Sequence, residues 1–240
     1  MNYNWNWSIF FEPSPEGTGT YADMLLSGLQ WTVATALCSW IIAFSLGSII
    51  GVMRTLPSKT ANAIGTGYVE LFRNIPLLVQ LFLWYSVMPE VLPENWGNWL
   101  KQLPNASFYT AVICLGFFTA SRVAEQVRAG IESLPRGQKM AGTALGLTTA
   151  QTYRYVILPI AYRVILPPMT SEFLNNLKNT SVALTIGLLE LTARARSMQE
   201  FSSQVFEAFT AATVIYLLIS LLIVTLAGKL ETRVAVPGSR

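Results

Sequence analysis

The chain has 240 residues, of which 52% are hydrophobic and only 12% are charged, and its formal net charge is +3. Soluble domains carry about 25% charged residues, so this composition indicates a protein whose main partner is a lipid bilayer. The small net charge argues against nucleic acid as a partner. The sequence has no histidine and no phosphate-binding glycine-rich loop, so we expect no catalytic residue, no cofactor and no metal site.

Five stretches are candidates for transmembrane helices, each of which needs about 20 mostly apolar residues. Two of them are compromised, because Pro76 interrupts the second stretch and the doublet Pro167-Pro168 interrupts the fourth. In chain order the five stretches are 28–53, 64–88, 108–131, 157–177 and 211–227. The sequence therefore predicts an all-α membrane protein, a bundle of about five transmembrane helices, with a single domain over 1–240.

The distribution of Lys and Arg predicts the orientation of these helices. If the N-terminus lies outside, more of these residues fall on the inner side than on the outer side, as the positive-inside rule requires. The inner residues are Arg54, Lys59, Arg128, Arg136, Lys139, Arg154, Lys229, Arg233 and Arg240, and the outer residues are Lys101, Lys178, Arg194 and Arg196. We therefore expect the N-terminus outside and the C-terminus inside the cell.

A pair of glycines in the first candidate helix predicts close packing. The stretch GSIIG places Gly47 and Gly51 four residues apart, on one face of a helix. Small residues at this spacing allow a second helix to approach closely. We expect that second helix to belong to the same chain.

Charged side chains occur inside the second and third candidate helices. A charge at the centre of a bilayer costs about 2.5–3.5 kcal/mol, so such residues face protein or a water-filled path. Glu70 and Arg73 are three residues apart, as are Arg122 and Glu125, and Glu125 and Arg128, so each pair shares a helix face. Two interpretations stay open: the pairs only hold helices together, or Arg73, Arg122 and Glu125 line a path for a charged solute.

A cluster of amides and hydroxyls lies at the end of the fourth candidate helix, in the stretch FLNNLKNTSVALTIG. Asn176, Asn179 and Thr180 have donors and acceptors that would bind the ammonium and carboxylate groups of a polar solute. The same residues would equally well cap helix ends. The residues alone leave both interpretations open.

The segment KMAGTALGLTTAQTYRYVILP, at 139–159, resembles the cytoplasmic loop of permease subunits of bacterial ATP-binding-cassette importers. That pattern is Glu-Ala-Ala, three residues, Gly, nine residues and Ile-x-Leu-Pro. Ala141 and Gly142 stand at its two alanines, Gly146 at its glycine, Val156 at its isoleucine and Pro159 at its proline. The stretches VELFRNIPLLVQLFLWY, IESLPRGQ and LKNTSVALTIG resemble the polar-amino-acid branch of the family, most closely the glutamate/aspartate importers.

The resemblance implies a permease domain over about 24–230 in a bacterial inner membrane, with a coupling loop at 137–159. It implies a non-catalytic subunit that works with a homologous second permease, two ATP-binding-cassette ATPase subunits and a periplasmic amino-acid-binding protein. The transported solute would be a polar, acidic amino acid. The alternative is an ion-gradient-coupled secondary transporter, although such proteins usually show internal repeats, which we do not find in this sequence.

Six residues of the loop are candidates for the contact with the ATPase: Gln138, Met140, Ala141, Gly142, Gly146 and Pro159. We expect a short helix at 138–145 whose small residues fit a groove on the partner, a positive φ at Gly146 that ends it, and a new helix that starts with Pro159. Met140 stands where the family has Glu. The contact must therefore rest on shape and not on a salt bridge at this position.

Arg122 is a second departure from the family, since we expect an aromatic or neutral residue there in many relatives. An arginine inside an apolar helix would supply positive charge that favours acidic amino acids along the path. Arg73 is the second choice for this role. The competing interpretation is a structural pair between Arg122 and Glu125.

Overall fold

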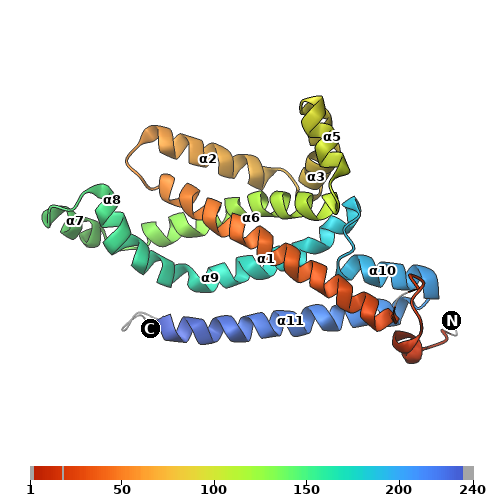
Figure 1. Ribbon diagram of the computed structural model, residues 1–240. Coiled ribbons are helices and arrows are strands. Elements are labelled where there is room, and N and C mark those ends of the chain that lie inside the picture. Colours follow the sequence, from red (N-terminus) through yellow and green to blue (C-terminus); the bar gives the residue numbers. More distant parts are fainter. Residues whose placement is uncertain (1–2, 18, 235–240) are drawn as a thin grey trace. The chain divides into compact units, whose positions relative to one another are not determined.

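The structure is a computed structural model that describes residues 3–17 and 19–234, and the regular secondary structure in this part of the chain is helical apart from one isolated bridge between Pro13 and Thr20 (Figure 1). The long helices are α1 (Tyr21–Met53), α2 (Lys59–Asn74), α6 (Ala106–Glu132), α9 (Leu158–Asn179) and α11 (Val205–Val234). The shorter elements are η1 (Trp7–Phe11), α3 (Leu77–Phe82), η2 (Leu83–Val87), α4 (Met88–Val91), α5 (Glu94–Gln102), α7 (Arg136–Ala144), α8 (Thr149–Thr152), η3 (Tyr153–Ile157), η4 (Thr180–Ile186) and α10 (Leu191–Ser202). The predicted all-α class is confirmed.

Three of the described helices are by themselves long and apolar enough to cross a membrane. They are α1, α6 and α11, whose most apolar windows have mean hydropathies of 2.0, 1.3 and 2.4. α9 covers the fourth predicted stretch as one helix, but it is less apolar because it carries Arg163 and Glu172. The first, third and fifth predicted spans are therefore confirmed as helices that suit a bilayer.

The second predicted span is not one straight helix. α2 ends at Asn74, the next helical segment begins at Leu77, and their directions differ by 99°. Ile75 is extended, with φ −98° and ψ 126°, because the ring of Pro76 disfavours a helical conformation at the residue before it. The interruption that the sequence predicts at Pro76 is therefore confirmed, and this part of the chain is sharply bent.

Two prolines each follow a π-helical turn. η2 ends two residues before Pro89, and η3 ends two residues before Pro159. Proline has no N–H for the carbonyl four residues earlier, and its ring crowds that carbonyl, so a wider turn relieves both problems. α8, η3 and α9 consequently form one unbroken helical run. Pro159 lies inside this run and does not start a new helix, which corrects the expectation from the sequence.

The chain folds into two compact units, each built from three segments. The first unit consists of Met1–Ser39, Pro76–Leu115 and Asn175–Leu221. One cluster of its core joins η1, α1, α10 and α11, and Leu191 and Met198 are fully buried there. A second cluster joins α3, α6 and η4. Helices that lie far apart in the sequence thus share both clusters.

The second unit consists of Trp40–Ile75, Gly116–Leu174 and Leu222–Arg240. Its main core cluster joins α6, η3 and α9 with the second half of α1. A Cβ on Gly47 would lie 2.6 Å from the Cβ of Val123, and a Cβ on Gly51 would lie 2.7 Å from the carbonyl oxygen of Ala124. The close approach predicted for GSIIG is confirmed, and the partner helix is α6 of the same chain.

Candidate functional site

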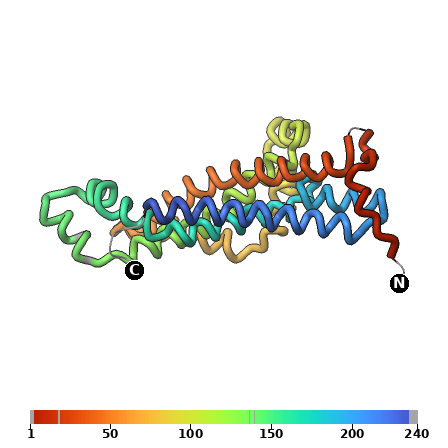
Figure 2. The backbone as a smooth tube through the Cα atoms, turned by 90° about the horizontal axis from the view of Figure 1, so that it is seen from below, coloured from red at the N-terminus to blue at the C-terminus, as the bar shows by residue number. Residues whose placement is uncertain are grey.

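The segment predicted to be the coupling loop, 137–159, begins with a short helix beyond the ends of the two long helices that it connects. α7 and α8 extend past the last turn of α6, and α8 leads into α9 (Figures 1 and 2). α7 covers Arg136–Ala144, so the helix expected at 138–145 is present and starts two residues earlier. The loop therefore has a defined shape of its own.

The turn at Gly146 ends α7 with a hydrogen-bonded cap. Gly146 has φ +75°, as predicted. Its N–H donates to the carbonyl of Thr143 at 3.0 Å, and the N–H of Leu147 donates to the carbonyl of Gly142 at 3.1 Å. This pair of bonds is the Schellman motif, which satisfies carbonyls that a helix end leaves open. A Cβ on Gly146 would meet nothing within 4 Å, so the backbone conformation alone favours glycine here.

Gly142 packs inside the loop. It is buried, and a Cβ there would come within 2.8 Å of Cγ2 and 2.9 Å of Oγ1 of Thr152. Thr152 ends α8, whose first turn is fixed by a capping box between Thr148 and Gln151. The small size of Gly142 therefore brings α7 against α8. Ala141 beside it stays exposed.

The surface of the loop carries two large apolar side chains. Met140 is 69% exposed and Leu145 is 79% exposed. Ala141 and Ala144 are exposed between them in the sequence. Exposed apolar side chains on a capped helix are chemically suited to a protein partner. This surface is open to a protein partner within the described residues.

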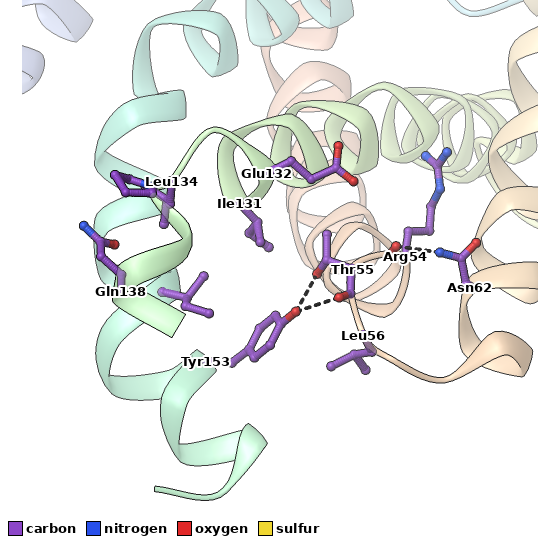
Figure 3. A pocket seen from close by; sticks show the side chains of 11 residues that line it. Arg54, Thr55, Leu56, Asn62, Ile131, Glu132, Leu134, Gln138 and Tyr153 are labelled. Atoms are coloured by element: carbon purple, nitrogen blue, oxygen red, sulfur yellow. Dashed lines mark hydrogen bonds between the residues drawn. The ribbon is translucent and has the colours of Figure 1, made fainter. Parts of the chain in front are cut away.

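A cavity of about 350 Å³ lies between α7, η3 and the adjoining ends of α1, α2 and α6 (Figure 3). Arg54, Asn62, Gln138 and Tyr153 are among its lining residues. The hydroxyl of Tyr153 donates to the carbonyl of Thr55 at 2.8 Å, and the amide of Asn62 donates to the carbonyl of Arg54 at 2.7 Å. These bonds tie η3 and α2 to the end of α1. The wall of this cavity therefore holds α2 and η3 at the end of α1.

Glu125 is the centre of a charged cluster. Its carboxylate lies 2.8 Å from Arg54, 3.3 Å from Arg73 and 3.5 Å from Arg128. The predicted pair with Arg128 is confirmed, whereas in the described part of the chain Arg73 pairs with Glu125 and not with Glu70. Arg54 is buried, so the cluster ties the end of α1 to α2 and α6. The structural interpretation is therefore favoured for Arg73 and Glu125.

Arg122 pairs with a residue of another helix. Its Nε donates to Oε2 of Glu172 at 2.7 Å, and the Glu172 side chain is only 9% exposed. The expected alternative, a pair with Glu125, is wrong because Glu125 faces arginines of α1, α2 and its own helix. The Arg122 side chain is 42% exposed, so part of its guanidinium remains accessible.

The amides at the end of α9 are largely used within the chain. Nδ2 of Asn176 donates to the carbonyl of Ala36 at 3.0 Å and to Oγ of Ser39 at 2.8 Å, and Asn176 is buried. The Thr180 hydroxyl is buried and donates to a carbonyl of the preceding turn at 2.7 Å. Asn179, the last residue of α9, is half-buried. The contacts of Asn176 and Thr180 therefore favour structural roles.

Sequence reasoning missed Arg54 and Tyr153 as parts of the site. The position of Arg54 directly after an apolar span, close to the charged end of a membrane helix, was a usable signal for a pair with an intramembrane carboxylate. No local signal pointed to Tyr153, because its partner Thr55 lies 98 positions away in the sequence.

Comparison with known proteins gives the family. Residues 43–236 match the family model described as "Binding-protein-dependent transport system inner membrane component". The chain is 51% identical to the glutamate/aspartate import permease protein GltJ of Escherichia coli K12, over 100% of this chain and 98% of that protein. It is 30% identical to the glutamine transport system permease protein GlnP of the same organism, over 89% of this chain and 94% of that protein. The crystal structure of an amino acid ABC transporter with histidines is similar, with a TM-score of 0.77, 31% identity and coverage of 89% of this chain and 95% of that chain. This chain therefore belongs to the family of binding-protein-dependent transport system inner membrane components.

Proposed function

We propose that this chain is the permease subunit of an ATP-driven importer of acidic amino acids in a bacterial inner membrane. The observation that carries the proposal is the identity to a glutamate/aspartate import permease over the whole chain. The amino acid ABC transporters among the relatives do not support the ion-gradient-coupled alternative. The subunit supplies the path, and a separate ATPase hydrolyses the ATP.

The subunit would work in a larger assembly. A homologous second permease would complete the path, a periplasmic binding protein would deliver the amino acid, and two ATPase subunits would bind on the cytoplasmic side. With the N-terminus outside, α1, the bent segment from α2 to α4, α6, α9 and α11 make the five expected membrane elements. This orientation puts α7 on the cytoplasmic side, where the ATPases lie.

The proposed contact with an ATPase is made by α7, mainly through Met140 and Leu145. Both are exposed apolar side chains that fit a groove on a partner. Movement of α7 would reach the membrane helices through the contact of Gly142 with α8 and through the hydrogen bond of Tyr153 to Thr55. Alternation between inward-facing and outward-facing states is then a shift of populations that the ATPase biases through this contact.

The preference for acidic substrates is assigned to Arg122. A guanidinium binds a carboxylate through two parallel hydrogen bonds, and this side chain is partly exposed beside its partner Glu172. Arg73 is also exposed and, like Arg122, is paired with a carboxylate, so it remains the second candidate. Asn179 remains a candidate for lining the substrate translocation path, whereas Asn176 and Thr180 are hydrogen-bonded within the chain.

The test is ATP-driven uptake by the complete assembly in proteoliposomes. The chain is co-purified with the second permease, the ATPase and the binding protein, and uptake of labelled glutamate is measured with and without ATP. We expect uptake to require ATP, and we expect unlabelled aspartate to compete better than glutamine. Uptake that follows an ion gradient without the ATPase would overturn the transport mechanism. Equal competition by glutamine would overturn only the acidic preference.

A further inference from the structure

An apolar groove of about 400 Å³ runs along α1, α9 and α11 in the second unit. Trp40 and Phe44 of α1 line it together with Tyr162 and Phe173 of α9. The ring of Trp40 lies 5.2 Å from that of Phe173, and the ring of Phe44 lies 5.8 Å from that of Tyr162. The two aromatic contacts fix α1 and α9 side by side along the groove (Figure 1). None of these residues belongs to the coupling loop or to the proposed path.

The groove has the length of one leaflet of a bilayer. On α9 it extends from Tyr162 to Phe173, which is a rise of about 16 Å at about 1.5 Å per residue. Half of a hydrocarbon core of about 30 Å is about 15 Å. On α11 the lining residues run from Ile223 to Leu230, near the last turns of that helix. One end of the groove therefore lies near the middle of the helices and the other near their charged ends.

Two arginines stand at the charged end. Arg163 is three residues before Leu166, which lines the groove on α9, and Arg233 is three residues after Leu230, which lines it on α11. Residues at this spacing are neighbours on a helix surface, so each arginine lies beside a lining residue at the margin of the groove. Both are exposed, and neither forms an ion pair within residues 3–17 and 19–234.

One carboxylate lies beside the groove, at the level of Thr170 on α9. Oε1 of Glu231 accepts a hydrogen bond from Oγ1 of Thr170 at 3.2 Å, and Thr170 lines the groove. Lys229 is exposed two residues earlier. Lys229, Arg163 and Arg233 outnumber this single carboxylate, so the charged side chains around the groove carry a net positive charge. The groove is thus apolar toward the middle of the helices and positive at their ends.

We propose that this groove binds one anionic phospholipid, with an acyl chain against Trp40 and Phe173 and the phosphate group beside Arg163 and Arg233. The lipid would lie in the direction that a bilayer imposes, with its chain toward the midplane and its headgroup at the surface. Basic residues near a membrane surface attract anionic headgroups, and basic pockets between membrane helices bind them selectively. The competing occupant is a helix of the second permease, and the test separates the two.

Native mass spectrometry of the complete assembly provides the test. The assembly is equilibrated in micelles that contain phosphatidylglycerol and phosphatidylcholine, and the lipid retained by the permease is identified. We expect phosphatidylglycerol to be retained in preference to phosphatidylcholine. The double variant Arg163→Gln/Arg233→Gln should bind it roughly 25-fold more weakly, at about fivefold for each arginine. The matched control Lys101→Gln/Arg196→Gln removes two exposed cations of the first unit and should bind it as the wild type does.

A second variant fills the groove without changing its charge. Ala227 lines the groove on α11, so Ala227→Phe should exclude the acyl chain and lose phosphatidylglycerol although both arginines remain. Gel filtration shows whether each variant still assembles. A photo-reactive side chain at position 227 should label lipid. Labelling of the second permease, equal retention of both lipids, or undiminished retention in the double variant would each overturn the proposal.

Discussion

Substitution of Gly146 tests whether the end of α7 carries movement into the membrane. An L-residue at φ +75° costs about 1–2 kcal/mol relative to glycine, and asparagine tolerates this region better. A Cβ at this position would meet nothing within 4 Å, so Gly146→Ala perturbs only the backbone. The population of the capped turn should therefore fall roughly 5–30-fold. Gly146→Trp adds bulk on the surface that we assign to the ATPase.

The assay is glutamate uptake per ATP hydrolysed by the complete assembly in proteoliposomes. Gly137→Ala is the matched control, because Gly137 also lies in α7 with open space around it but has no positive φ, and alanine favours a helix by about 1 kcal/mol. We expect the ratio of uptake to hydrolysis to fall in Gly146→Ala and further in Gly146→Trp. It should be largely kept in Gly146→Asn and unchanged in Gly137→Ala, with all variants inserted in the membrane.

Normal coupling in Gly146→Trp would refute this reasoning. Hydrogen exchange at the amide of Leu147, which donates to Gly142 in the cap, locates the fault. Faster exchange in Gly146→Ala with an unchanged ratio of uptake to ATP hydrolysis would show that the cap opens more often but that its opening does not affect transport. Unchanged exchange would show instead that the assigned strain is absent.

Three further substitutions separate structural from transport roles. Gly47→Ala places a methyl group 2.6 Å from Val123 and should lower the free energy of unfolding by about 1–3 kcal/mol in thermal unfolding. Gly67→Ala, where a Cβ meets nothing within 4 Å, should leave it unchanged, and equal stabilities of the two variants would contradict the close contact. Asn176→Ala removes two buried hydrogen bonds and should cost about 1–3 kcal/mol while KM for glutamate stays the same; a raised KM with full stability would make Asn176 a substrate residue. Arg122→Gln should reduce the preference for glutamate over glutamine about tenfold in competition assays, and an unchanged preference would end its assignment to the path.

The features that local chemistry controls were predictable from the sequence. The positive φ of Gly146 follows from glycine at a helix end, and the break in the second span follows from Pro76. The packing of Gly47 and Gly51 follows from their spacing on one helix face. The first two follow from a residue and its immediate neighbours, and the third follows from the small size of two residues on one helix face.

The partners of the charged side chains were not predictable, because they depend on how the helices are rotated against each other. Arg122 and Glu125 share a helix face by spacing, yet Arg122 reaches Glu172 on α9 while Glu125 reaches α1 and α2. Asn176 is similar, since its amide is used by α1, which lies far away in the sequence. Spacing along one helix limits the choice of partners, but the packing of other helices decides among them.

Met140 stands where the family motif has an acid, and in the proposed contact of α7 with an ATPase this would change the kind of interaction. A surface salt bridge at this position would contribute about 0–1 kcal/mol and would weaken with salt. Full burial of a methionine side chain contributes about 1.5–3 kcal/mol and is insensitive to screening, and Met140 is 69% exposed before any partner binds. We therefore expect uptake per ATP in the wild-type assembly to change little between low and high salt. Met140→Glu should make the same ratio fall as salt rises, whereas Met140→Leu should behave as the wild type. Equal salt dependence of wild type and Met140→Glu would show that position 140 does not touch the ATPase.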